Sequence, residues 1–92
     1  PTQALSLLNS RFANDQAVLF ARNVAAQAGA DPQKQVTHVL GRVLQRTPTA
    51  AEVSRGVRLM ADLQRADRLA PDAALKAYCL VALNLNEFLY LD

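Results

Sequence analysis

The sequence has one cysteine, no tryptophan, few aromatic residues and no long hydrophobic run. A single cysteine, Cys79, excludes an internal disulfide, and no cysteine motif for a metal, a redox centre or covalently attached haem is present. The longest apolar stretch, near residues 79–83, is far shorter than the ~20 residues that a membrane-spanning helix requires. No alternating apolar run appears, so strands are not expected.

The composition is that of a folded domain. The chain has 92 residues, of which 51% are hydrophobic and 20% charged. A chain of this length has room for a single core. The formal net charge of +2 is too small to argue for a polyanionic partner. We expect residues 1–92 to form one helical domain. Since Pro1 is an unusual first residue, we also expect the C-terminal fragment of a larger multidomain protein.

Apolar residues recur at threes and fours, which predicts helices throughout. A short helix is expected within residues 2–9, and a longer one after Asn14, whose side chain suits an N-cap. Gly29 suits a left-handed C-terminal cap, and Asp31 followed by Pro32 marks the start of a third helix that reaches about Gln45.

A capping box marks the start of the fourth predicted helix. Thr49 and Glu52 have the required separation, so each side chain can accept a hydrogen bond from the backbone N–H of the other. This helix is expected to continue to about residue 66, with Gly56 at a close helix crossing. Arg58 and Asp62 lie one turn apart and are expected to pair.

The end of the chain, LNLNEFLYLD, carries polar residues inside an apolar run. A fifth helix is expected from Pro71. Because a buried amide without partners is unfavourable, we expect this helix to end near Asn84 and Asn86 to cap a new turn. Glu87 and Tyr90 complete this motif. The fold prediction is therefore all-α, a small bundle of four to five helices with a short C-terminal turn or helix.

Three groups of residues have the chemistry of a reactive site. His38 and Met60 are a conceivable axial pair for haem, but no attachment sequence accompanies them. Cys79 lies among apolar neighbours, which is typical of an inert thiol. Glu87 and Tyr90 could act as an acid and a base, but no second carboxylate or metal cluster supports them. We predict no catalytic, cofactor-binding or metal-binding residue in this chain.

A basic face on the third helix is the best candidate for an interaction surface. Its members recur at four-residue steps: Lys34, His38, Arg42 and Arg46. No aromatic residue interleaves them, and charge runs usually form a solvated surface. Nucleic-acid binding through this face would weaken steeply with salt.

Three segments occur in a characteristic order: ALSLLNSRF, GRVLQRTPTAAE and LNLNEFLYLD. In these segments and their order, the chain resembles the C-terminal part of a planctomycete cytochrome c-associated domain of unknown function. The central pattern falls on Arg46, Pro48, Thr49 and Glu52, and the terminal pattern on Asn86, Glu87, Phe88 and Tyr90. The resemblance implies a large exported bacterial protein, in the periplasm or another extracytoplasmic space, with any haem elsewhere in the parent chain. It implies no activity.

These observations favour a non-catalytic helical module that docks against other domains of the same polypeptide or against a partner protein. One alternative is an accessory part of an enzyme or redox site whose chemistry lies upstream. Another is weak binding of nucleic acid or an anionic polymer through the basic face.

Overall fold

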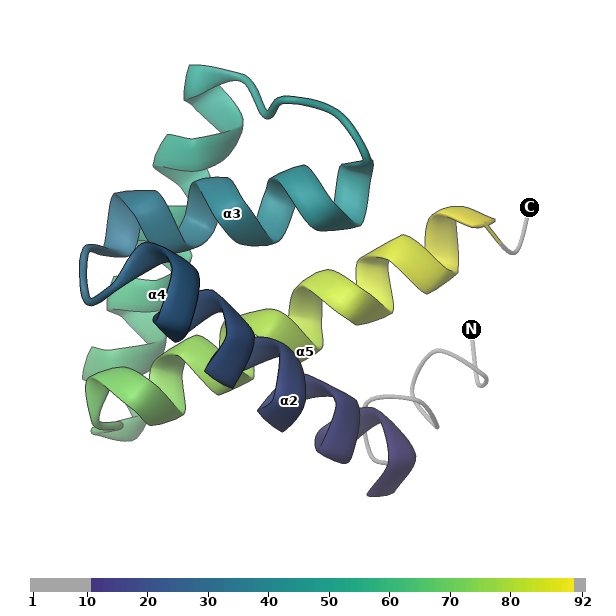
Figure 1. The fold of residues 1–92 in the computed structure, drawn as a ribbon. Helices are drawn as coiled ribbons and strands as arrows, with labels where there is room; N and C mark the ends of the chain where they lie inside the picture. The colour runs from purple at the N-terminus through teal and green to yellow at the C-terminus, as the bar shows by residue number, and fades with distance from the viewer. Residues whose placement is uncertain (1–10, 91–92) are drawn as a thin grey trace.

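The fold is a small bundle of helices, seen in a computed structural model that describes residues 11–90, without the side chains of residues 12, 13 and 85–90. Four helices follow one another: α2 (Arg11–Ala28), α3 (Pro32–Leu44), α4 (Ala50–Asp67) and α5 (Pro71–Tyr90) (Figure 1). No strand occurs within this described part, so the predicted all-α class is confirmed. The short helix predicted within residues 2–9 lies outside it.

Helix α5 is the centre of the bundle because it packs against each of the other three helices. Helix α3 contacts both α2 and α4, whereas α2 and α4 do not contact each other. The core is built from small and medium apolar side chains: Ala17, Ala21, Val24, Val36, Val39, Val43, Val53, Met60, Leu75, Tyr78, Cys79 and Ala82. None of the described helices is long and apolar enough to cross a membrane.

Gly56 lies where α4 meets both α3 and α5. A Cβ atom at this position would lie 2.5 Å from Tyr78 Oη and 2.5 Å from Val36 Cγ1. Both distances are far inside van der Waals contact, so the close crossing predicted from this glycine is confirmed. The missing side chain allows one residue from α3 and one from α5 to reach the α4 backbone.

The helix boundaries around α3 also follow the sequence. Gly29 has a φ of 73°, and its backbone N–H donates to Ala25 O at 2.9 Å. The Asp31 carboxylate accepts a hydrogen bond from Gln33 N at 3.0 Å, as expected of an N-cap. The buried Gln35 amide donates to Gly29 O at 2.7 Å, so the turn between α2 and α3 is held from both sides.

Two helix ends differ from the prediction. Asn14 lies inside α2, which begins at Arg11, so its predicted N-cap role is wrong. Helix α5 continues through Asn84 to Tyr90, and the predicted bend there is also wrong. Asparagine in a helix interior costs only about 0.7 kcal/mol relative to alanine. This is less than the loss of the backbone hydrogen bonds that a break would cause.

Asn84 therefore remains helical and only partly buried. Its Oδ1 atom is enclosed and has no hydrogen-bond partner in the described structure. The backbone of Asn86, Glu87 and Tyr90 belongs to the same helix. Their side chains lie outside the described residues, so the predicted roles of Asn86, Glu87 and Tyr90 stay predictions.

Candidate functional site

The predicted basic face is only partly assembled by the structure. Lys34, His38 and Arg42 follow one another at one-turn spacing on α3, and Lys34 and Arg42 are exposed. His38 is partly buried, and its Nε2 atom is enclosed without a hydrogen-bond partner in the described structure. It is therefore not the solvated side chain that the four-residue spacing suggests.

Arg46 leaves this face because α3 ends before it. Gln45 adopts a left-handed conformation, with a φ of 56°, and caps the helix. The Arg46 guanidinium then turns to the start of α4 and donates to both carboxylate oxygens of Glu52, at 2.9 and 2.8 Å. A bidentate pair of this kind fixes the orientation of both side chains.

The Glu52 carboxylate also completes the predicted capping box, which is confirmed. Glu52 Oε1 accepts from Thr49 N at 2.8 Å, while Thr49 Oγ1 accepts from Glu52 N at 3.1 Å. The hydrogen bonds from Arg46 and from the Thr49 backbone lower the pKa of Glu52 from 4.5 to about 2. Hydrogen bonding to the same carboxylate raises the pKa of Arg46. This cluster holds the α3–α4 connection and is structural.

The outer face of α4 carries the predicted charged side chains, with a different pairing. Arg65 donates to Asp62, so the predicted pairing of Asp62 with Arg58 is wrong. A pair three residues apart is as accessible on a helix as one four residues apart. Both side chains are largely exposed, which makes the pair a minor contributor to stability.

Cys79 is fully buried in the core, where burial raises the pKa of its thiol to about 12. Burial also raises the pKa of the neighbouring Tyr78 to about 12, with a smaller contribution from Cys79. A thiol with such a pKa stays protonated at neutral pH and is a poor nucleophile. Met60 is a core residue, and no cluster of metal-binding side chains occurs among residues 11–84 that have described side chains.

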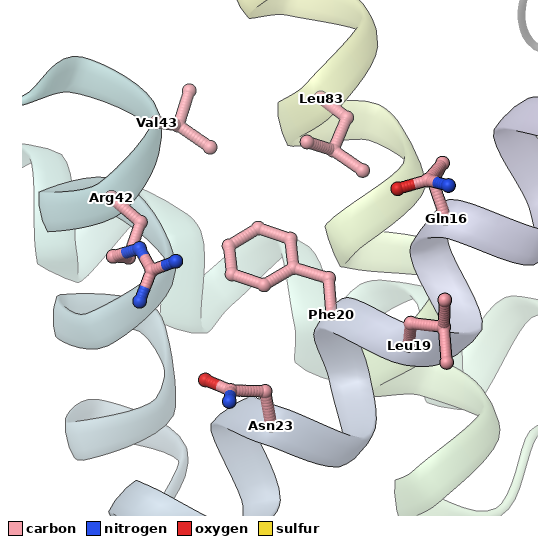
Figure 2. A pocket seen from close by; sticks show the side chains of 7 residues that line it. All are labelled: Gln16, Leu19, Phe20, Asn23, Arg42, Val43 and Leu83. Carbon is pink, nitrogen blue, oxygen red and sulfur yellow. The ribbon is translucent and has the colours of Figure 1, made fainter.

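A groove between α2, α3 and α5 is a surface feature that the sequence patterns do not predict. It has a volume of about 380 Å³ and is lined by Gln16, Leu19, Phe20, Asn23, Arg42, Val43 and Leu83. Figure 2 shows the Phe20 ring projecting from α2 into the space between α3 and α5. Leu19, beside it, is 58% exposed.

The described lining of the groove suits binding better than catalysis. Phe20 and Leu83 pack against the core and provide apolar surface, while Gln16 and Asn23 supply amide groups on the α2 side. Arg42 is the one ionisable group among the lining residues whose side chains the structure describes. A single guanidinium without a base or nucleophile can orient a bound group but does not form an acid–base pair.

One signal in the sequence could have pointed to this groove. The core stripe of α2 consists of Ala17, Ala21 and Val24. Leu19 is two residues from the start of this stripe and therefore faces away from it on a helix. A large apolar side chain outside the buried stripe is an indicator of an interaction surface when other apolar residues adjoin it.

Comparison with known proteins gives a family but no function. The family model described as "PSD1: Protein of unknown function (DUF1553)" matches residues 1–60. This range holds two of the three segments on which the resemblance to a domain of unknown function depends; the terminal segment, residues 83–92, lies outside it. No curated protein and no solved structure matches the chain. Because the family model covers well over half of its residues, the chain belongs to the PSD1 family of proteins of unknown function.

Proposed function

We propose that this chain is a non-catalytic helical module that docks against another domain of its own polypeptide. The observation that carries the proposal is the groove between α2, α3 and α5, where Leu19 is 58% exposed beside Phe20 and Leu83. A fully buried leucine gains about 1.5–3 kcal/mol over an exposed one, so covering Leu19 would contribute about 1 kcal/mol to docking.

The rest of the chain supports a binding role over a catalytic one. Of the reactive groups named from the sequence that have described side chains, Cys79 and Met60 are core residues and His38 is not among the residues that line the groove. The Arg46 and Glu52 side chains are engaged with each other at the start of α4. What the groove offers is apolar surface with a polar edge, which is the usual composition of an interface between domains.

The setting of the module is proposed from the resemblance alone. Similarity of the three segments to a planctomycete cytochrome c-associated domain supports an exported bacterial protein, with haem in another part of the parent polypeptide. Docking would then place this module against one of the accompanying domains.

Docking is tested by thiol labelling at the groove. Leu19→Cys is introduced into the 92-residue chain and into the complete natural protein, and labelling by a small thiol reagent is timed in each. Arg55→Cys, on the exposed face of α4, is the matched control. Cys79 adds little background because it is buried and its pKa is about 12.

Position 19 is expected to react about tenfold or more slowly in the complete protein, because the centre of an interface excludes solvent. Position 55 is expected to react equally fast in both. Equal rates at position 19 in the two proteins would overturn the proposal.

A further inference from the structure

The groove has a different character along its two edges. Its α3 edge carries the exposed Arg42, with the exposed Lys34 two turns earlier on the same face. Neither cation forms an ion pair within the described structure, and none of the lining residues with a described side chain is acidic. Its α2 edge carries the neutral amides of Gln16 and Asn23. The electrostatic potential is therefore positive on one edge of the apolar floor.

We infer that this groove receives an amphipathic helix whose apolar stripe is flanked by carboxylates on the side that faces α3. The inference rests on the docking function proposed above and names the chemistry of the docked segment. Leu19, Phe20 and Leu83 offer a short apolar floor of the kind that takes helix residues at i, i+4 and i+7. A carboxylate next to Arg42 can form two parallel hydrogen bonds with its guanidinium, which fixes the register of the helix.

A nucleic acid is a poorer fit to the same surface. Binding to a phosphate backbone draws its affinity from many cations along a track. Here one cation, Arg42, lines a floor of aliphatic and aromatic side chains, and Phe20 is packed against the core. Stacking of bases requires aromatic rings presented to solvent. The combination of apolar floor and single cationic edge favours a protein segment.

The test uses two synthetic helical peptides of about 18 residues, or five turns. Both carry leucine at i, i+4, i+7 and i+11, and one has glutamates along a flank where the other has lysines. Binding to the chain is followed by NMR chemical shifts and titrated at low and moderate salt. The variants are Arg42→Glu, Leu19→Asp and, as a control on the exposed face of α4, Arg55→Glu. Circular dichroism melts verify that each variant folds.

The glutamate peptide is expected to bind the unmodified chain about tenfold more tightly than the lysine peptide, with shifts at Leu19 and Phe20. Arg42→Glu is expected to reverse this preference, Arg55→Glu to leave it unchanged, and Leu19→Asp to weaken both peptides. A single-stranded oligonucleotide of equal charge is expected to bind less tightly than the glutamate peptide.

Three results would overturn the inference: equal affinity for the two peptides, binding of neither, or tighter binding of the oligonucleotide. None of them decides whether the groove is covered in the complete protein, which the labelling of position 19 measures separately. If position 19 were labelled equally fast in the 92-residue chain and in the complete protein, and the glutamate peptide still bound tightly, domain docking would be rejected. The groove would then be a site for another protein.

Discussion

Two places in the bundle differ in how tightly the helices pack: the crossing at Gly56, here called the closed side, and the groove between α2, α3 and α5, here called the open side. At the crossing of α4 with α3 and α5, a Cβ atom on Gly56 would lie 2.5 Å from both Tyr78 Oη and Val36 Cγ1, so Tyr78 and Val36 fill the place of a side chain there. Where α2 meets α3 and α5, a groove of about 380 Å³ persists, and Leu19 is largely exposed. Both sides are rich in apolar residues, so hydrophobicity alone does not decide which side closes.

The size and direction of a few side chains make the difference. On the closed side a residue without a side chain lies at the crossing, so two neighbours fill its place. On the open side Phe20 projects between α3 and α5 (Figure 2). Leu19, next to it, lies outside the buried stripe of α2 and is 58% exposed. Apolar area left uncovered in this way is available to a partner, which is the physical basis of the docking proposal.

Filling the closed side should have the largest effect on stability. Gly56→Val is expected to lower the free energy of unfolding by about 3 kcal/mol or more, because its side chain would overlap Tyr78 and Val36. Urea denaturation measures the change. Gly41→Ala is the matched control, since a Cβ atom there meets only Arg46 O, at 4.0 Å, and alanine favours a helix by about 1 kcal/mol. If both variants were equally stable, Gly56 would not lie at a tight crossing.

Acid should loosen the connection on the closed side. The pKa of Glu52 is lowered from 4.5 to about 2 in the folded chain, so its contribution is complete above pH 4.5 and is lost as the pH falls towards 2. Melting temperatures of the unmodified chain and of Glu52→Gln, compared from pH 6 to pH 2, isolate this contribution from that of other carboxylates. The difference between the two is expected to shrink by a few degrees over this window. If the difference in melting temperature stayed constant with pH, the Arg46–Glu52 pair would not contribute to stability.

A smaller effect is expected in the C-terminal half of α5, the helix that both places share. Asn84→Ala is expected to raise the free energy of unfolding by about 0.5–1 kcal/mol, because alanine favours the helix and an enclosed oxygen without a partner is removed. Asn23→Ala, on the exposed face of α2, gains the helix preference alone and is the control. Destabilisation by Asn84→Ala would mean that the Asn84 side chain makes a stabilising contact.

The features that could be predicted from the sequence depend on neighbouring residues. Asp31 before Pro32 and Thr49 three residues before Glu52 are complete signals for a helix start, because the cap and its backbone donor lie in the same turn. Gly56 was also informative, since a glycine inside an apolar helical pattern usually has a packing reason. The recurrence of apolar residues at threes and fours also predicted helices, and the described part of the chain is built from four of them.

The features that could not be predicted depend on the arrangement in space. Gln45 ends α3 in a left-handed conformation without a glycine to signal it, so Arg46 was assigned to a face that it leaves. Asn84 has the residue type of a helix end, but α5 continues through it to Tyr90. The groove requires Leu19, Arg42 and Leu83 from three helices, and no local pattern joins them.

The most direct measurement is the solvent access of position 19 in the complete protein. If the open side of the bundle receives another domain, a cysteine at position 19 should be shielded there by about tenfold or more relative to the 92-residue chain, while one at position 55 keeps its reactivity. Unchanged reactivity at position 19 would mean that the groove faces water in the working protein, and the docking account would be wrong.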